Sequence, residues 1–455
     1  MMEPRFAGKK AVVYGIGRSG VAAARLLEKA GAHVSAVDDR GEHELGSAPA
    51  LLRSSGMTLC LGARPKNLLA AADLLVVSPG VSLALPDIQS AAAAGVQVWA
   101  EVELAWRFLS PGKVVGITGT NGKSTTTALT GELLARSGRR VFVGGNLGRP
   151  LSEAARDGEP FDCYCIELSS FQLEGIEAMR INAAALLNLT PDHLDRYANL
   201  DEYGAAKARI FKNQQVGDFA VINGDDPAVI ELARAARVPL YPFSLKASAR
   251  PSGAARATRA SDGFKLDLRE GSETYALANA ALRGEHNVQN AMAATLLARL
   301  CGVSKAQAQR GLDAFAGLPH RLESVRVLDG VEWINDSKAT NVDSSLVALR
   351  ALPANIWLIA GGRGKGAPYT PLVESSQGKL KGVLTIGEDG AAVGAAFAPS
   401  CAVHTCQTLE RAVARAYSLA SSGDIVLLSP ACASYDQFRN FEERGDAFKK
   451  LVRRL

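Results

Sequence analysis

Apolar and polar positions alternate in a regular rhythm over the first hundred residues. Short apolar runs of the kind that form buried strands are separated by stretches in which apolar residues recur at helical spacing. The runs are KAVVY at 10–14, HVSAVDD at 33–39, DLLVVSPG at 73–80 and VQVWA at 96–100, and the helical stretches include GVAAARLLEKAG at 20–31 and PDIQSAAAAG at 86–95. This rhythm predicts a Rossmann-like domain over residues 1–100, with a parallel sheet and helices on both faces.

The rhythm begins again twice along the chain. After an amphipathic stretch at 101–109 and a Ser-Pro-Gly break, the run KVVGIT at 113–118 starts a second α/β domain, assigned to residues 101–317. Its polar stretch from Lys246 to Glu273 fits either a hairpin or a loop region. A break at Gly-Leu-Pro then precedes a third, Rossmann-like domain over residues 318–455. We therefore expect an α/β protein of three domains.

Composition narrows the possible partners and the compartment. The 455 residues, 47% of them hydrophobic, suffice for several cores. The net charge of +5 is slight and the basic residues are scattered, so we expect no nucleic-acid partner. The chain shows no signal-peptide pattern, no apolar run near the roughly 18 residues of a membrane span, and no CxxC pair among its seven cysteines. We expect a cytoplasmic protein with buried thiols and take a monomer as the default.

A first glycine-rich turn follows the first apolar run. Gly15-x-Gly17-x-x-Gly20 precedes a helix, where small residues let backbone N–H groups approach a pyrophosphate. Asp38 and Asp39 end the next strand, where an acid that binds ribose would lie. Alone this pattern suggests NAD, although such turns also serve only to pack a helix on a strand. It favours a nucleotide without identifying it.

A second glycine-rich loop carries the strongest chemical signal. The sequence TGTNGKST at 118–125 follows a strand and precedes a helix, which predicts a P-loop-type ATPase domain. Lys123 would reach the β- and γ-phosphates and the Ser124 hydroxyl would bind Mg²⁺. The spacing departs from the strict P-loop pattern because Ile117 stands at the position of the first glycine. Glu167, at the end of the run CYCIE, would offer Mg²⁺ an oxygen if the two strands are neighbours.

A histidine lies between two acids in the segment that follows the run AAALLNL. This segment, TPDHLDR at 190–196, is read either as a capped turn or as part of a site. Together with the glycine-rich loops it resembles the Mur ligase superfamily. The resemblance rests on GGNLG at 144–148, ELSSFQL at 167–173, DHLDRY at 192–197, GEHNVQNAMAA at 284–294, GLPHR at 317–321, NDSKATN at 335–341 and SPACASYDQF at 429–438. With the glycine-rich turn of the first domain included, the resemblance runs through all three inferred domains.

The resemblance implies a role for each matched position. The implied catalytic residues are Lys123, Glu167, His193 and Lys207. Two Mg²⁺ ions would be held by Ser124, Glu167, His193 and Lys207, the last as a carbamate, whose anionic oxygens suit Mg²⁺. The implied ATP contacts are Gly119, Thr120, Asn121, Gly122, Lys123, Ser124, Thr125, Asn287, Asn290, Arg321 and Asp336. The implied UDP-substrate contacts are Gly15, Gly17, Arg18, Ser19, Asp38, Asp39, Arg40, Ser78, Gly80, Asn146 and Gln172. The implied D-glutamate contacts are Lys338, Thr340, Lys365, Ser434 and Phe441.

The implied activity is an ATP-dependent ligation in bacterial peptidoglycan synthesis. D-glutamate would be joined to UDP-N-acetylmuramoyl-L-alanine through an acyl phosphate, and the DNPR-type signature of ligases that add a diamino acid is absent. Domain closure about hinges near Pro111 and Pro319 would bring the reactants together. Three alternatives stay open: a dehydrogenase that uses the N-terminal turn, a regulator that binds nucleotide without catalysis, and a sister ligase with another acceptor such as L-alanine or a folate-type polyglutamate.

Overall fold

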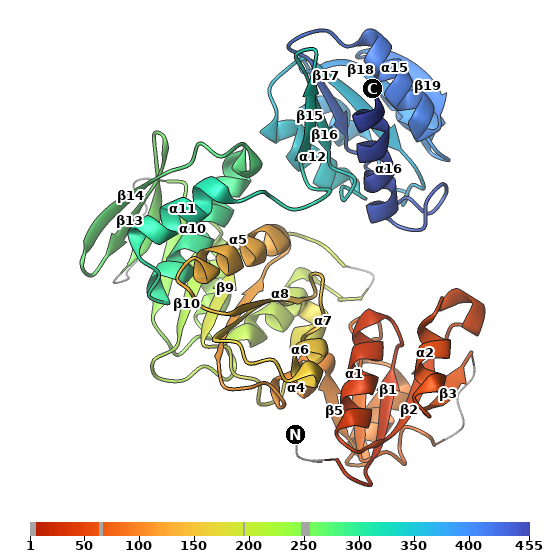
Figure 1. The fold of residues 1–455 in the computed structure, drawn as a ribbon, viewed down its shortest axis with the longest axis vertical. Coiled ribbons are helices and arrows are strands. Elements are labelled where there is room, and N and C mark those ends of the chain that lie inside the picture. The colour runs from red at the N-terminus through yellow and green to blue at the C-terminus, as the bar shows by residue number, and fades with distance from the viewer. Residues whose placement is uncertain (1–5, 63–66, 194–195, 247–254) are drawn as a thin grey trace. The chain divides into compact units, whose positions relative to one another are not determined.

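The computed structural model describes residues 6–62, 67–193, 196–246 and 255–455 (Figure 1). Over these ranges the strands form three sheets, each rich in parallel pairs, which confirms the expected α/β class. By internal contacts the chain divides into two compact units. The first comprises Met1–Leu277 with Gln289–Asp313, and the second Ala278–Val288 with Ala314–Leu455. The domain boundaries expected from the sequence stay predictions.

The first sheet is a Rossmann-type sheet. Its strand order is β3-β2-β1-β4-β5, and all its pairs are parallel. The elements are β1 (Lys10–Tyr14), α1 (Arg18–Lys29), β2 (His33–Asp38), α2 (Ala48–Ser54), β3 (Thr58–Leu61), β4 (Leu74–Val77), α3 (Pro86–Ala93) and β5 (Gln97–Ala100). Apolar clusters lie on both faces, one including side chains of α1 and the other those of α3. The four expected strands are confirmed, and β3 is an addition.

Packing explains the third glycine of the first turn. A Cβ at Gly20, in the first turn of α1, would overlap the carbonyl oxygen of Gly15. Only glycine therefore allows this helix to approach the end of β1 so closely. The close approach brings the N-terminus of α1 to the point where the strand order reverses between β1 and β4, which is where open α/β sheets bind ligands.

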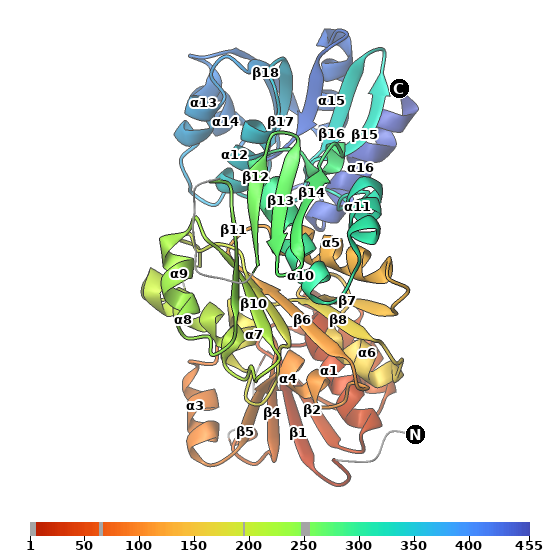
Figure 2. The same ribbon diagram turned by 90° about the vertical axis from the view of Figure 1, so that its left-hand side faces the viewer.

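The second sheet has the order β14-β13-β12-β11-β10-β9-β6-β8-β7. It contains β6 (Lys113–Thr118), β7 (Val141–Gly145), β8 (Cys163–Glu167), β9 (Ala183–Leu186), β10 (Phe219–Asn223), β11 (Leu240–Ser244), β12 (Arg256–Ala260), β13 (Gly263–Leu268) and β14 (Gly271–Ala276). Pairs from β7 to β12 are parallel, whereas β12, β13 and β14 pair antiparallel (Figure 2). Of the two interpretations for Lys246 to Glu273, the hairpin is therefore correct, with residues 247–254 outside the described ranges.

The helices of this region include α4 (Glu101–Trp106), α5 (Lys123–Ala135), α6 (Leu151–Asp157), α7 (Ser170–Glu174), α8 (Leu200–Ala208), α9 (Pro227–Ala233), α10 (Glu285–Leu300) and α11 (Lys305–Ala314). Helices α4 and α6 pack against α1, so the first two sheets share one apolar core within the first unit. Trp99 and Phe142, which come from different sheets, both belong to that core. The two nucleotide-type loops are therefore held on one body.

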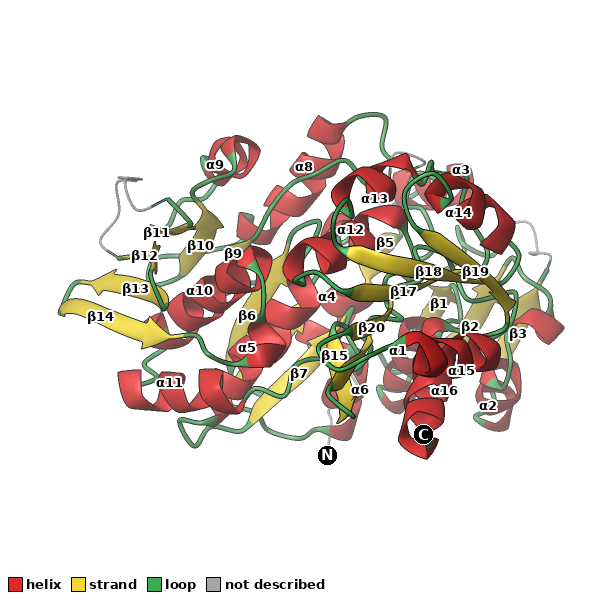
Figure 3. Cartoon of the chain, turned by 90° about the horizontal axis from the view of Figure 1, so that it is seen from above, coloured by secondary structure: helices red, strands yellow, loops and turns green. Residues whose placement is uncertain are grey.

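The third sheet has the order β15-β16-β20-β17-β18-β19, with only the β15–β16 pair antiparallel. Its elements are β15 (Glu323–Leu328), β16 (Val331–Asn335), α12 (Val342–Ala351), β17 (Ile356–Gly361), α13 (Thr370–Ser375), β18 (Leu380–Ile386), α14 (Gly390–Phe397), β19 (Ala402–Gln407), α15 (Leu409–Leu419), β20 (Ile425–Leu428) and α16 (Phe441–Arg454). Helices α12, α13 and α14 cover one face, and α15 and α16 the other (Figure 3). None of the described helices is long and apolar enough to cross a membrane.

Candidate functional site

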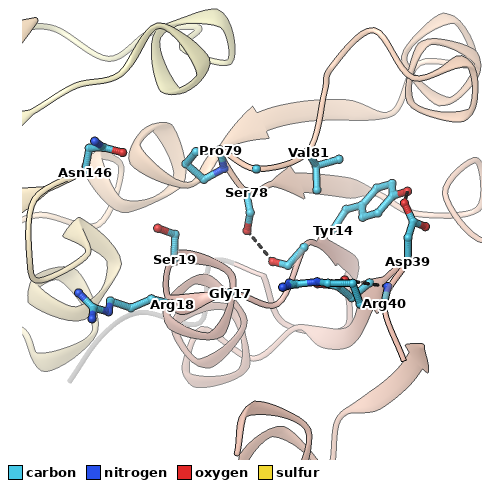
Figure 4. A pocket seen from close by; sticks show the side chains of 13 residues that line it. Tyr14, Gly17, Arg18, Ser19, Asp39, Arg40, Ser78, Pro79, Val81 and Asn146 are labelled. Carbon is cyan, nitrogen blue, oxygen red and sulfur yellow. Dashed lines mark hydrogen bonds and ion pairs between the residues drawn. The ribbon is translucent and has the colours of Figure 1, made fainter. Parts of the chain in front are cut away.

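A cavity of about 510 Å³ lies at the carboxyl ends of β1, β2 and β4. Ten of the eleven residues expected around the UDP-bearing substrate line it. These are Gly15, Gly17, Arg18, Ser19, Asp38, Asp39, Arg40, Ser78, Gly80 and Asn146, and Tyr14, Pro79 and Val81 complete the lining (Figure 4). The structure thus brings together positions up to about 130 residues apart in the sequence.

Asp38 holds the turn that forms the floor of this cavity. One of its oxygens accepts a hydrogen bond from the Ile16 N–H at 2.9 Å, and the Arg40 guanidinium donates to both oxygens at 2.9 Å. Burial raises the pKa of Asp38, but the hydrogen bonds from Arg40 and Ile16 outweigh burial and keep it below its ordinary value. The Ser78 hydroxyl donates to the Gly15 carbonyl at 2.6 Å, which joins the two loops (Figure 4).

Asp39 is oriented by a residue that sequence analysis missed. The Tyr14 hydroxyl donates to Asp39 Oδ2 at 2.7 Å. No motif predicts this contact, because Tyr14 has the pattern of an ordinary strand residue and its partner comes just after the next strand. The bond holds the Asp39 carboxylate against the Tyr14 hydroxyl, and both residues line the cavity (Figure 4).

Asn146, in the loop after β7, connects this cavity to the second sheet. Its backbone N–H donates to the Glu167 carbonyl at 2.9 Å, and its side-chain amide donates to Glu167 Oε1 at 2.8 Å. Arg18, at the start of α1, donates to the Gly148 carbonyl in the same loop at 2.9 Å. Gln172 does not line the cavity; it caps α7, with its Oε1 accepting from the Ser169 N–H at 3.0 Å. Its role toward substrate stays a prediction.

The second glycine-rich loop joins β6 to α5 as expected. Ile117 is a buried residue of β6, so the chain does not turn at that position. Gly119 and Gly122 have φ values of +149° and +83°, which only glycine adopts readily, and they form the turn instead. The Lys123 ammonium donates to the carbonyls of Gly119 and Thr120 at 3.0 and 2.7 Å, so it lies over the loop whose N–H groups would face phosphate.

Glu167 ends β8, which pairs with β6. The sequence-based expectation that Glu167 could offer Mg²⁺ an oxygen required these two strands to be neighbours, and they are. Its side chain is 3% exposed, and its Oε2 atom has no hydrogen-bond partner among the described residues. A buried carboxylate oxygen without a partner is costly unless a cation or donor satisfies it. This orphaned oxygen, together with the Ser124 hydroxyl, fits the hard-oxygen ligands that Mg²⁺ prefers.

Lys207, in α8, is fully buried beside the same loop. Its ammonium nitrogen donates to the Gly119 carbonyl at 2.9 Å and lies 4.2 Å from the centre of the Tyr203 ring. Burial, together with the nearby charge of Lys123, lowers the pKa of Lys207 to about 6. The side chain is therefore mostly a neutral amine at physiological pH.

His193 lies at a sharp turn with φ +53°. Its ring contacts Phe171 and Tyr203 edge to face, with centroid distances of 4.9 and 6.1 Å, and its Nε2 lies 3.6 Å from Asp192 Oδ2. In the described part of the chain, no three His, Cys, Asp or Glu side chains form a ready-made metal cluster. The donor set around Glu167 would therefore need oxygens from another group to hold two metal ions.

Helices α5 and α10 lie side by side next to the loop (Figures 1 and 3). The Thr126 hydroxyl of α5 donates to Asn290 Oδ1 of α10 at 3.2 Å, and a Cβ at Gly122 would overlap that same side chain. Asn287 donates to the Arg283 carbonyl at 2.9 Å one turn earlier. The two asparagines expected near adenine thus come from one helix, and Asn290 lies against the loop.

Asp336 and Arg321 belong to the second unit. Asp336 is buried at the end of β16, where it accepts from the Ser429 hydroxyl at 2.8 Å and from the Leu322 N–H at 3.2 Å. Burial raises its pKa to about 7 despite these bonds and the charge of Arg321. The Nε of Arg321 is buried without a partner in the described residues. Such groups mark candidate functional positions.

The residues expected at D-glutamate also lie in the second unit. Lys338 has its ammonium 5.8 Å from the centre of the Phe441 ring, and its backbone N–H donates to the His320 carbonyl. Ser434 is buried and Lys365 is exposed. The Thr340 N–H donates to the Lys338 carbonyl at 2.9 Å.

Arg444, in α16, is a second residue that sequence analysis missed. It is buried and donates to the Ser337 hydroxyl at 3.0 Å and to the Cys432 carbonyl at 3.1 Å. The Ser337 hydroxyl donates in turn to the Phe441 carbonyl at 2.9 Å. Burial lowers the pKa of Arg444 to about 10. This guanidinium ties together the segments that carry Lys338, Ser434 and Phe441.

Family models match most of the chain. The Mur ligase MurD-like N-terminal domain matches residues 9–100, the Mur ligase middle domain residues 117–298, and the Mur ligase glutamate ligase domain residues 320–432. Among curated relatives, the UDP-N-acetylmuramoylalanine--D-glutamate ligase of Myxococcus xanthus is 60% identical over 98% of this chain and 99% of its own length. The protein of the same name from Anaeromyxobacter dehalogenans is 53% identical over 99% of both chains.

Solved structures show the same fold at lower identity. UDP-N-acetylmuramate-alanine ligase MurC from Thermotoga maritima matches with a TM-score of 0.62 and 19% identity, over 98% of this chain and 99% of its own. MurF ligase from Thermotoga maritima, solved in complex with ADP, matches with a TM-score of 0.59 and 18% identity, over 100% of this chain and 98% of its own.

Proposed function

This chain belongs to the Mur ligase family, and from that membership and its site geometry we propose that it joins D-glutamate to UDP-N-acetylmuramoyl-L-alanine with ATP. The observation that carries the proposal is the phosphate loop with its buried Glu167 and Lys207, which lies beside a nucleotide-sized cavity on the same body. The reaction forms an amide bond and yields ADP and phosphate. It belongs to peptidoglycan biosynthesis.

The cavity of the first sheet supports binding of the UDP end of the substrate. Backbone N–H groups at the N-terminus of α1 would face the diphosphate, because helix N-termini attract anions. Asp39 and Arg40 would contact uridine, and Ser78 would hold the opposite loop in place. Asn146 lines the cavity and also binds Glu167, so the substrate's alanine end would lie toward the phosphate loop.

The first chemical step activates the alanine carboxylate. A carboxylate oxygen attacks the γ-phosphorus of ATP, the bond to the β,γ-bridging oxygen breaks, and ADP leaves. Lys123 and the N–H groups of the loop 119–125 would oppose the negative charge that develops, and Asn287 and Asn290 would hold adenine. Arg321 and Asp336 are assigned to the same nucleotide. Bound Mg²⁺ would neutralise charge on the transferring phosphoryl group.

Glu167, Ser124 and His193 are the proposed protein ligands of Mg²⁺, with Lys207 as a fourth after carbamylation. Only a neutral amine can add to CO₂, and burial keeps Lys207 mostly neutral. The carbamate would supply the further anionic oxygens that this donor set needs. His193 is assigned here as a metal ligand and not as a proton carrier.

The second step consumes the acyl phosphate. The D-glutamate nitrogen, after losing its ammonium proton, attacks the acyl carbon, and phosphate leaves with the former carboxylate oxygen. Lys338, Thr340, Lys365, Ser434 and Phe441 are the proposed D-glutamate contacts. Lysines suit the two carboxylates of this substrate because each presents a positive point charge. The cytoplasmic location and the monomeric state stay predictions.

Phosphate release tests the proposal. The chain is incubated with ATP, Mg²⁺ and UDP-N-acetylmuramoyl-L-alanine, and D-glutamate, L-glutamate, L-alanine or a diamino acid is added in turn. Release with D-glutamate alone, absent in Lys123→Ala, is the expected result. Release with another amino acid would assign the chain a sister ligase activity. If no added amino acid causes phosphate release, the proposal is contradicted.

A further inference from the structure

Arg196 joins the loop after β4 to the second sheet within the first unit. Its guanidinium donates to the Pro79 carbonyl at 3.0 Å and to the Val81 carbonyl at 3.4 Å, and both residues line the cavity (Figure 4). The same guanidinium binds Glu174 of α7 at 3.0 Å. The contacts to the loop span more than a hundred residues of sequence, so they form only in the folded protein.

The other side of this contact leads to the phosphate site. The Arg196 guanidinium carbon lies 3.9 Å from the centre of the Phe171 ring, and the His193 imidazole meets that ring edge to face at 4.9 Å. The Arg196 and Tyr197 N–H groups both donate to the His193 carbonyl, at 2.9 and 3.1 Å. Arg196 therefore contacts the cavity loop directly and the His193 turn through two independent routes.

From this arrangement we infer that Arg196 is a positioning residue that fixes the substrate loop 78–81 relative to the His193 turn. The inference rests on the proposed function, in which the loop contacts the UDP-bearing substrate and the turn contributes to phosphoryl transfer. Arg196 touches no reacting atom. It keeps loop 78–81 and the His193 turn at a fixed position relative to each other. This position matters because displacements of about 1 Å can lower a rate by about 100-fold.

The chemistry of the contact favours arginine over other cations. A planar guanidinium can donate to two carbonyls and a carboxylate while its face covers an aromatic ring. A lysine ammonium has three donors but no flat face, so it cannot reproduce this set. The side chain is only 13% exposed, which limits the water that could replace the lost donors. We therefore expect Arg196→Lys to lower kcat, as Arg196→Met does.

Arg107 provides a matched control. Its guanidinium carbon lies 4.1 Å from the centre of the Trp99 ring, and it binds Glu177 at 3.0 Å, so it also joins the first sheet to the second through a ring and a glutamate. Its guanidinium also binds Glu103 at 2.8 Å, and these three partners, Trp99, Glu103 and Glu177, lie outside loop 78–81 and the His193 turn. Arg107→Met should therefore lower the stability as Arg196→Met does, but leave loop 78–81 in place relative to the His193 turn.

The experiment measures kcat, the KM values for ATP and the UDP-bearing substrate, the Kd for UDP alone, and the melting temperature. Arg196→Met and Arg196→Lys, with the unmodified chain and Arg107→Met in parallel, are assayed at least ten degrees below the lowest melting temperature. For the Arg196 variants we expect kcat to fall about 10- to 100-fold, with the Kd for UDP and the KM for ATP within about threefold. Arg107→Met should keep kcat within about twofold.

Three results would overturn the inference. The first is a kcat for both Arg196 variants within threefold of the unmodified chain, which would leave Arg196 a purely structural role. The second is an equal fall of kcat in Arg107→Met. That would mean that any lost contact between the first and second sheets lowers kcat, and not specifically the contact that Arg196 makes with loop 78–81. The third is an unmodified chain without D-glutamate-dependent phosphate release, which would overturn the proposed function and this inference with it. If Arg196→Met does not fold, the same measurements are compared for Arg196→Lys and Glu174→Gln.

Discussion

Replacing Lys207 with methionine should stabilise the protein while it abolishes activity. In the unfolded chain the amine has its ordinary pKa of 10.5, whereas burial lowers the folded-state pKa to about 6. Between these values the unfolded state binds one proton more than the native state, so stability rises with pH and is lower at acidic pH. The slope is about 1.4 kcal/mol per pH unit for one group.

The magnitude follows from the same two values. At about pH 7.5, three units below the unfolded pKa, holding Lys207 neutral costs about 4 kcal/mol. Methionine has no proton to lose, and it forfeits the hydrogen bond to the Gly119 carbonyl, worth about 1 kcal/mol. The net gain is about 3 kcal/mol, which in a unit of this size raises the melting temperature by about 5 °C.

Thermal melts of Lys207→Met and the unmodified chain in CO₂-free buffer without nucleotide, from about pH 6.5 to 9, measure this effect. The gap between the two melting temperatures should narrow as pH rises, because the cost of deprotonation falls. Lys212→Met, a change at an exposed lysine, is the control and should show no such trend. A variant that melts lower than the unmodified chain at neutral pH, or a gap that does not change with pH, would show that burial of the Lys207 amine does not destabilise the fold.

Two further changes test the phosphate loop and its metal ligand, and a third tests a buried carboxyl group of α4. Gly122→Ala places a side chain at a positive φ and against Asn290, so ATP affinity measured by calorimetry should fall at least about 10-fold while UDP affinity stays unchanged; equal ATP affinity would contradict this. Glu167→Gln keeps the shape but removes the carboxylate charge, so titration of ADP at increasing Mg²⁺ should lose its Mg²⁺ dependence; a retained dependence would remove Glu167 as a ligand. Glu101 is buried, and burial raises its pKa from 4.5 to about 7, so stability falls as pH rises between these values. At pH 8 Glu101→Gln should therefore be more stable than the unmodified chain by up to about 3 kcal/mol, and it should have a higher melting temperature. An unchanged or lower melting temperature would contradict this prediction.

The sequence predicted local features of the site well. Strand, glycine turn and helix are contiguous in the chain, so the phosphate loop and the first turn could be placed from spacing alone. The fold class followed from the repeated βαβ rhythm for the same reason. Strand β3 was missed because its four residues, Thr58–Leu61, are only partly buried and give little apolar signal.

Features that depend on tertiary contacts could not be predicted. Whether Glu167 reaches the phosphate loop depends on β8 pairing with β6, and no spacing in the sequence states that pairing. The low pKa of Lys207 comes from burial, which only the folded chain creates. Arg196 binds backbone carbonyls more than a hundred residues away, and any residue could supply those carbonyls.

Gln172 shows a signal that sequence reasoning passed over. Ser169 and Gln172 have the spacing of a capping box, in which the first side chain and the fourth satisfy each other's backbone N–H groups. The structure contains that box at the start of α7. The pattern alone therefore indicated a local structural task for this glutamine, whatever contact it also makes with substrate.

Oxygen isotope transfer tests most directly whether the chain ligates D-glutamate through an acyl phosphate. The chain is given ATP, Mg²⁺, D-glutamate and UDP-N-acetylmuramoyl-L-alanine with ¹⁸O in the alanine carboxylate, and both products are analysed by mass spectrometry. We expect a sugar product that has gained one glutamate residue through an amide, and inorganic phosphate that carries one ¹⁸O. A product without glutamate would contradict the ligase assignment, and phosphate without label would contradict the acyl phosphate.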